Sequence, residues 1–391
     1  MTFSPHPTPS AWASRAIATL ATEAAAVPAS PVHRFPLPDG WGIDLFLVDE
    51  STQPTGSLKH RLARSLFIDA LESGRLREGC TVIEASSGST AVSEAYFARM
   101  LGLEFIAVMP SSTSASKITL IEAAGGSCRL VDDPAGLAAQ AHRIAAEVDG
   151  CFLDQFSNAS RVSDWAGESG IAAALFRAAS GTRHPVPHSI VVGAGTGGTS
   201  TTVGRYLRAR GHATSVVVAD PEGSAYFDAI TGHTPTSAYR GSRIEGIGRP
   251  TAEIAFDPTA VDAALTVDDA LSIAGMLLLE ETCGLRAGPS TGTNLVGALT
   301  VAAGMRERGE TGSIVTLLCD GAERYSASYY NDSWRIERGF DVSVGLGSLR
   351  RLLADAPSTD DGTPRVVRRQ IPSSGPNPGG ENSRTVMIAL P

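Results

Sequence analysis

The chain contains only two lysines, Lys59 and Lys117; every other basic residue among its 32 lysines and arginines is an arginine. An arginine stays charged because its pKa lies above about 12, whereas a lysine amine can lose its proton and attack a carbonyl group. If this protein performs amine chemistry, one of these two lysines must carry it.

Lys59 lies in the segment PTGSLKHR (54–61). Pro54 and Gly56 predict a turn, and Ser57 is typical of a residue that caps the start of a helix. Lys59 would then occupy the first helical turn, where the positive end of the helix dipole favours the neutral, nucleophilic amine. The alternative interpretation is an ordinary solvated lysine at a helix start.

A second segment, EASSGSTA (84–91), also reads as a strand that runs through a turn into a helix. Its hydroxyl groups lie beside backbone N–H groups at the expected helix start, an arrangement suited to a carboxylate. Simple capping of the helix is the alternative. The candidate residues are Ser86, Ser87, Ser89 and Thr90.

A third segment, VVGAGTGGTS (191–200), ends a strand in a glycine-rich turn and predicts a phosphate at the start of the next helix. The same residues fit G-x-G-x-x-G, and Asp220 follows the next strand, where a dinucleotide fold places its ribose-binding acid. A nicotinamide-dependent dehydrogenase therefore stays open on this motif. A fourth turn, AGPSTGTN (287–294), offers the hydroxyls of Ser290 and Thr291, or merely caps a helix.

Strand-like and helix-like runs alternate along the chain, which indicates βαβ units and mostly parallel sheets. Ligands of such sheets bind beyond the carboxyl ends of the strands. The repetition on both sides of residue 185 suggests two lobes. The expected strands are 43–50, 81–86, 105–110, 128–133, 189–195, 214–221 and 313–320, and the expected helices are 57–73, 90–101, 114–124, 134–148 and 198–210.

The composition narrows the class of protein. The chain has 391 residues with a net charge of −9, which argues against a nucleic-acid partner. No apolar stretch approaches the ~20 residues of a membrane span, and the N-terminus lacks the pattern of a secretory signal, so we expect a cytoplasmic protein. The five cysteines are scattered, and prolines separate His184 from His188, so we expect no metal site.

We expect four regions along the chain. Residues 1–35 form an N-terminal arm with one alanine-rich helix over 10–26. Residues 36–185 form the first α/β lobe, which carries Lys59, and residues 186–345 form the second, which carries the phosphate site. Residues 346–391 form a disordered tail, because proline, glycine, serine and charged residues dominate its end.

Taken in order, these turns resemble those of the fold-type II pyridoxal-phosphate enzymes, the cysteine synthase and cystathionine β-synthase group. The resemblance covers residues 40–340 and implies a two-lobed fold like that of the tryptophan synthase β subunit, each lobe a mostly parallel sheet covered by helices. Its long blocks are most similar to L-cysteine desulfhydrases of the mycobacterial type. The matching blocks are PTGSLKHR, EASSGSTA, GAGTGGT, SRIEGIGRP (242–250), GPSTGTN and CDGAERY (319–325).

The resemblance implies that pyridoxal 5'-phosphate is the cofactor and that Lys59 binds it covalently and is catalytic. Ser290 would face the pyridine nitrogen, and Lys117 has no counterpart among the functional residues. The glycine turn would bind the cofactor phosphate through Gly195, Thr196, Gly197, Gly198 and Thr199. The substrate carboxylate would be bound by Ser86, Ser87, Ser89, Thr90 and Gln155.

The implied reaction is β-elimination on L-cysteine through an aminoacrylate, giving sulfide, pyruvate and ammonia. A neutral Ser290 favours β-elimination or β-replacement over transamination, so a cysteine synthase-type reaction with O-acetylserine or O-phosphoserine is the alternative. Ser89 stands where cysteine synthases have an asparagine that also supports the cofactor ring, which puts acetylserine-type substrates in doubt. The remaining possibility is that this chain is a relative of these enzymes without catalytic activity.

Two further expectations concern Arg249 and the assembly. Arg249 is either a further anion contact or a surface residue, and the family implies a homodimer.

Overall fold

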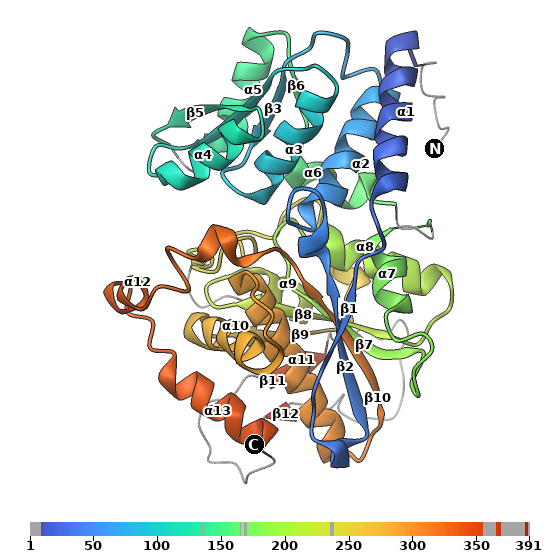
Figure 1. The fold of residues 1–391 in the computed structure, drawn as a ribbon, viewed down its shortest axis with the longest axis vertical. Coiled ribbons are helices and arrows are strands. Elements are labelled where there is room, and N and C mark those ends of the chain that lie inside the picture. The colour runs from blue at the N-terminus through green and yellow to red at the C-terminus, as the bar shows by residue number, and fades with distance from the viewer. Residues whose placement is uncertain are drawn as a thin grey trace. The chain divides into compact units, whose positions relative to one another are not determined.

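The computed structural model describes residues 9–133, 136–164, 166–167, 170–234 and 238–354, and the backbone of 365–368 and 388–389. The chain forms two compact units, the first made of residues 1–30 and 50–164 and the second of residues 31–49 and 165–391. Figure 1 shows a sheet flanked by helices in each unit.

The first unit is built on a four-stranded, fully parallel sheet in the order β5-β4-β3-β6. Its strands are β3 (Val82–Ala85), β4 (Phe105–Pro110), β5 (Ser127–Val131) and β6 (Cys151–Phe152). Its helices are α1 (Ala11–Ala26), α2 (Lys59–Glu72), α3 (Ser89–Met100), α4 (Ala115–Ala123), α5 (Leu137–Glu147) and α6 (Gln155–Val162).

Helix α1 is part of the packed first unit, although the sequence suggested a peripheral arm. Leu20 is fully buried, and Ala13 and Ala16 pack in the same apolar cluster as residues of α2 and α3. Small alanine side chains allow a helix to approach its neighbour closely, so few large apolar residues are needed to dock it.

The second unit has an eight-stranded sheet in the order β1-β2-β10-β7-β8-β9-β11-β12. The five central strands are parallel, and the outer strands are antiparallel. The strands are β1 (Val32–Phe35), β2 (Ile43–Asp49), β7 (Pro187–Val192), β8 (Ser215–Pro221), β9 (Ala263–Val267), β10 (Gly312–Leu318), β11 (Arg365–Arg368) and β12 (Ile388–Ala389). The helices are α7 (Ile171–Arg177), α8 (Gly198–Ala209), α9 (Tyr226–Thr231), α10 (Asp269–Cys283), α11 (Pro289–Glu307), α12 (Asp332–Glu337) and α13 (Ser343–Leu353).

The predicted α/β architecture with mostly parallel sheets is confirmed, but the units divide the chain differently from the expected lobes. Strand β2 was expected in the first lobe, yet it pairs with β10 in the second unit, because all seven of its residues are buried there. Residues 165–185 also belong to the second unit.

The expected tail, 346–391, begins inside helix α13. Leu349 is buried in the main apolar cluster of the second unit, and Leu346, Leu352 and Leu353 pack against the same cluster. Their spacing of three and four residues is that of one helix face. Residues 355–364, 369–387 and 390–391 of this expected tail lie outside the described residues.

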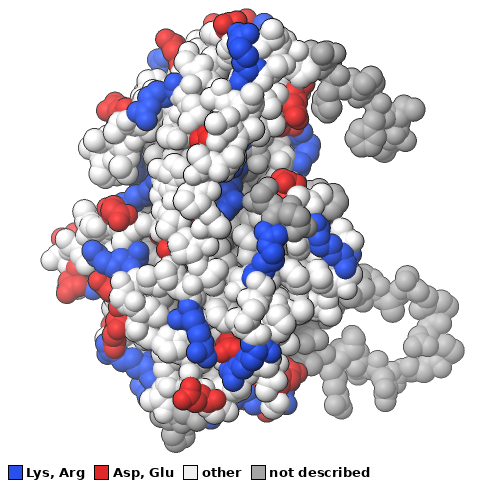
Figure 2. Space-filling model, turned by 45° about the vertical axis from the view of Figure 1, so that its right-hand side comes forward, with Lys and Arg blue, Asp and Glu red and all other residues white. Residues whose placement is uncertain are grey.

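Charged side chains of both signs are interspersed on the face drawn in Figure 2, without a large area of one sign on that face. None of the helices in the described ranges combines the length and apolar character that a bilayer crossing requires.

Candidate active site

The lysine turn (residues 54–59) leads directly into helix α2. Gly56 adopts a left-handed backbone conformation with φ of 70°. The helix begins at Lys59 itself, and the buried Ser57 hydroxyl accepts a hydrogen bond from the Lys59 backbone N–H (3.2 Å). Ser57 thus satisfies a donor of the first turn although Leu58 holds the capping position. The structure therefore places the half-buried Lys59 at the positive end of α2.

His60 fixes the lysine turn to its surroundings. Its ring is fully buried, and burial lowers the pKa of His60 to about 4, so the imidazole is neutral at neutral pH. Nε2 lies 2.8 Å from the Glu23 carboxylate of α1, and Nδ1 lies 3.3 Å from the Thr55 hydroxyl. Since Nε2–H donates to Glu23, Nδ1 is the acceptor for Thr55. Helix α1 thereby braces the residue that follows Lys59.

The serine turn (residues 86–90) connects β3 to α3. Gly88 precedes the first helical residue, Ser89, and its backbone N–H donates to the Ser86 hydroxyl (3.3 Å). Ser86, Ser87 and Ser89 are partly exposed, whereas Thr90 is buried. The turn thus presents three accessible hydroxyl groups at the N-terminus of a twelve-residue helix.

Gln155, expected beside the serine turn from 65 residues further along the chain, does lie there. The Thr90 hydroxyl donates to the Gln155 side-chain carbonyl (2.8 Å), and both residues are buried. Gln155 is the first residue of α6, which follows β6, and β6 pairs with β3. The five candidate carboxylate contacts therefore share one end of the first unit's sheet.

Two carboxyl groups, Glu84 of β3 and Glu94 of α3, lie beneath this turn and were missed from the sequence. Both are fully buried. Burial raises the pKa of Glu84 to about 8, and burial together with Glu84 raises the pKa of Glu94 well above its usual range. The available signal was a glutamate inside the apolar strand VIEA and another among the apolar residues of α3.

The glycine turn (residues 193–199) follows β7 in the second unit. Gly197 caps α8 in a left-handed conformation with φ of 76°, and the Gly198 N–H donates to the Thr196 hydroxyl (3.1 Å). A Cβ atom on Gly195 would lie 2.3 Å from the Gly246 carbonyl oxygen, so no side chain fits there. The first turn of α8 contains no acidic residue, which suits an anion.

The segment SRIEGIGRP packs against the glycine turn. The Gly248 N–H donates to the Ala194 carbonyl (2.8 Å), and the Tyr226 hydroxyl donates to the Gly195 carbonyl (2.6 Å). Arg249 forms an ion pair with Glu253 (2.7 Å) and is about half exposed. This pairing gives Arg249 a local partner and fits its interpretation as a surface residue.

Ser290 is the second residue of α11 and is only 4% exposed. Within the described part of the chain its hydroxyl has no hydrogen-bond partner. The neighbouring Thr291 hydroxyl accepts the Cys319 backbone N–H (2.9 Å), which ties the start of α11 to the end of β10. Ser290 is thus a neutral, buried polar group at the carboxyl edge of the second sheet.

Two other candidates have local roles. Asp220 is fully buried, and its carboxylate accepts the Phe227 backbone N–H (2.7 Å) near the start of α9; burial raises its pKa to about 7. An acid in that position is not available to a ribose hydroxyl, which weakens the dinucleotide interpretation.

Lys117 lies in the first turn of α4 and is half-buried. No group of three His, Cys, Asp or Glu side chains within the described ranges could hold a metal ion.

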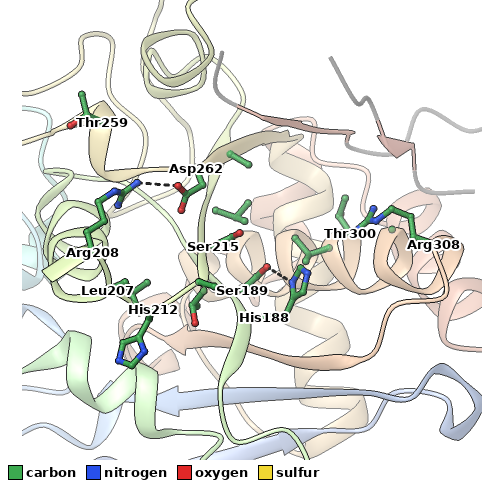
Figure 3. A pocket seen from close by; sticks show the side chains of 16 residues that line it. His188, Ser189, Leu207, Arg208, His212, Ser215, Thr259, Asp262, Thr300 and Arg308 are labelled. Carbon is green, nitrogen blue, oxygen red and sulfur yellow. Dashed lines mark hydrogen bonds and ion pairs between the residues drawn. The ribbon is translucent and has the colours of Figure 1, made fainter. Parts of the chain in front are cut away.

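A cavity of about 470 Å³ in the second unit contains none of the candidate residues (Figure 3). It lies at the amino ends of β7, β8 and β9, opposite the edge at which parallel sheets bind ligands. Its Arg208 is occupied by Asp262 (3.0 Å) and by the Ala260 carbonyl (2.6 Å). We therefore do not assign the chemistry to this cavity.

The family model described as "Pyridoxal-phosphate dependent enzyme" matches residues 25–320. The chain is 50% identical over 343 residues to L-cysteine desulfhydrase Cds1 of Mycobacterium tuberculosis, covering 86% of this chain and 93% of that protein. It is 32% identical over 294 residues to a cystathionine beta-synthase of Dictyostelium discoideum, covering 73% and 56%. The crystal structure of O-ureido-L-serine synthase matches with a TM-score of 0.68 at 25% identity, covering 81% of this chain and 98% of that one.

Proposed function

Since the chain belongs to the family of pyridoxal-phosphate-dependent enzymes, we propose that it converts L-cysteine and water into sulfide, pyruvate and ammonia, with Lys59 as the covalent anchor of the cofactor. The observation that carries the proposal is the 50% identity to an L-cysteine desulfhydrase over most of both chains. The placement of Lys59 as the first residue of α2 supports its role.

The residues present fit pyridoxal phosphate. The start of α8 offers backbone N–H groups without a capping carboxylate, as a phosphate requires, and Gly195 and Gly197 keep side chains away from it. The Ser290 hydroxyl, buried and without a partner in the described residues, can hydrogen-bond a neutral pyridine nitrogen. Thr196 and Thr199 would complete the phosphate contacts.

The bound cofactor supplies an electron sink that weakens the bonds to the substrate Cα. The ε-amino group of Lys59, in its neutral form, accepts the Cα proton as general base. Hydroxyl groups of the serine turn, with Gln155, hold the substrate carboxylate and so fix the direction of the Cα–H bond. The Cα–H and Cβ–S bonds break, sulfide leaves, and water replaces the amino nitrogen to give pyruvate and ammonia.

β-Replacement is the second candidate, because the similar proteins include a cystathionine beta-synthase and an O-ureido-L-serine synthase. Ser89 bears on the choice: it stands where cysteine synthases have an asparagine that also supports the cofactor ring, and this difference favours elimination over replacement.

One pair of assays separates the two reactions. The enzyme is given L-cysteine alone, and sulfide and pyruvate are measured; it is then given O-acetylserine or O-phosphoserine with sulfide, and cysteine is measured. We expect the first rate to exceed the second. If the rate of cysteine synthesis is instead tenfold higher than the rate of cysteine breakdown, the enzyme is a synthase and the desulfhydrase assignment is wrong.

We further propose that the enzyme acts as a cytoplasmic homodimer, as its family membership suggests. Light scattering of the purified holoenzyme measures its mass directly. A mass near 81 kDa, twice the 40.5 kDa of one chain, is expected, and a monomer mass would contradict the proposal.

A further inference from the structure

Glu84 and Glu94 form a buried carboxyl pair that the proposed mechanism does not use. Both side chains have no exposed surface. Within the described residues, neither oxygen of Glu94 has an N–H or O–H donor, and the charged group that acts on it is the Glu84 carboxylate. Two ionised carboxylates cannot be buried in contact without a large cost in free energy, so at least one proton must lie between them.

Glu84 is the acceptor of this pair. Its Oε1 accepts the Ala85 backbone N–H (2.8 Å), and its Oε2 accepts the Gln155 backbone N–H (3.2 Å). Because these two donors occupy Glu84, we assign the shared proton to Glu94, which donates it to Glu84.

The carboxyl pair is joined to the serine turn through Gln155. The backbone of Gln155 binds Glu84, and its side chain accepts the hydrogen bond of Thr90 (2.8 Å). Displacement of Glu84 would therefore move Gln155 and release Thr90. Glu84 is also two residues from Ser86 along the chain, so the pair constrains both ends of the turn.

We propose that Glu84 and Glu94 are positioning residues that share one proton, and that loss of this proton in alkaline solution disorders the serine turn and lowers the affinity for the substrate carboxylate. The proposal rests on the proposed function, since it assigns the serine turn to the substrate.

One further charged group acts on the pair: in addition to burial, the Asp154 carboxylate, which precedes α6, raises the pKa of Glu84. The Cys151 thiol of β6 is also close to Glu94, but burial raises the pKa of Cys151 to about 12, so the thiol is neutral at pH 9 and adds no charge. Burial and the Glu84 carboxylate raise the pKa of Glu94 well above its usual range, which places the loss of the shared proton in alkaline solution. The two groups titrate as a pair, and ionisation of both leaves like charges in contact.

The test compares KM for L-cysteine at pH 7 and pH 9 in the holoenzymes of wild type and Glu94→Gln. Loss of the shared proton in alkaline solution should raise the wild-type KM severalfold between pH 7 and pH 9, while kcat changes less than twofold. A glutamine amide donates to Glu84 without titrating, so the variant should lack this rise.

The substrate amine and thiol titrate in the same range, so the decisive quantity is the ratio of wild-type to variant KM at each pH. Asp269→Asn is the control, because Asp269 is a buried acid with a pKa raised to about 6 by burial, but it lies on α10, away from the serine turn. It should retain the wild-type profile. Equal profiles in wild type and Glu94→Gln would overturn the proposal.

Infrared spectroscopy tests the pair without relying on turnover or on a variant's folding. The wild-type holoenzyme should show the C=O stretch of a protonated carboxylic acid at pH 7, and this band should weaken as the pH is raised into the alkaline range. A spectrum without the band at pH 7 overturns the shared proton. If the band titrates but L-cysteine is not a substrate, the desulfhydrase assignment fails while the shared proton stands.

Discussion

The Thr55 hydroxyl of the lysine turn lies 2.8 Å from the Ser93 hydroxyl of helix α3. Ser93 in turn donates to the carbonyl of Ser89, the first residue of that helix (2.8 Å). This contact joins the turn that carries Lys59 to the turn proposed to bind the substrate carboxylate. Both turns belong to the first unit, so their relative position is fixed by hydrogen bonds within it.

Replacing Thr55 by valine should weaken this link. The change removes the Thr55 hydroxyl from the buried His60 Nδ1 and from the Ser93 hydroxyl, which keeps only its hydrogen bond to the Ser89 carbonyl; we expect a cost of about 1–3 kcal/mol in the free energy of unfolding. The KM for L-cysteine should rise as well. Urea denaturation and steady-state kinetics measure both effects. Thr19→Val is the matched control, because the Thr19 hydroxyl is exposed and donates only within α1. Equal losses in the two variants would contradict the link.

His60 predicts how stability depends on pH in acid. Its pKa falls from 6.5 to about 4 on folding, so the folded state resists protonation. The stabilisation is complete above pH 6.5 and is lost as the pH falls toward 4, by about 3 kcal/mol for a shift of this size.

His60→Gln should remove this part of the pH dependence. Urea denaturation of the holoenzyme at several pH values between 4 and 7 measures how steeply the free energy of unfolding changes with pH. His33→Gln serves as the control, because His33 is a partly exposed histidine in the second unit. Identical slopes in wild type and His60→Gln would show that His60 does not carry the effect.

Much of the first unit was predictable from the sequence, because its apolar runs and turn residues agree with the folded elements. The expected strand over 105–110 coincides with β4, and the expected helix over 10–26 differs from α1 by one residue. Short strands without a strong apolar run, such as β6 and β9, were missed. Their pairing partners come from distant parts of the chain, and local patterns carry no information about them.

The candidate residues are adjacent to turn signals, which is why they could be named in advance. Gly195 shows what the sequence could not reveal. Only glycine fits at this position because the Gly246 carbonyl, 51 residues away along the chain, lies too close for a side chain. The carboxyl pair was missed for a related reason. In the sequence, Glu84 is one residue of a predicted strand and Glu94 one residue of a predicted helix. Only the fold buries both carboxyl groups together, and this burial is not visible in the local sequence.

Borohydride reduction should identify the lysine that binds the cofactor. We expect the reduced adduct on the peptide that contains Lys59, because that lysine starts α2 in the turn shared with the family. Lys59→Ala should lose the adduct and the visible absorbance band, whereas Lys117→Ala should keep both, since Lys117 lies on α4. Peptide mapping by mass spectrometry reads the result. An adduct on Lys117 in the wild type would overturn the assignment.

Gly195→Ala tests the phosphate site independently of catalysis. The new methyl group would lie 2.3 Å from the Gly246 carbonyl oxygen, so the glycine turn or the segment at Gly246 must shift. Since backbone N–H groups bind an anion only from fixed positions, we expect the Kd for pyridoxal phosphate to rise at least about tenfold, or about 1.4 kcal/mol. Equilibrium dialysis of the cofactor measures it. Gly40→Ala is the control, because a Cβ atom at Gly40 meets nothing within 4 Å and the residue lies outside the candidate site. An unchanged Kd in Gly195→Ala would show that the phosphate binds elsewhere.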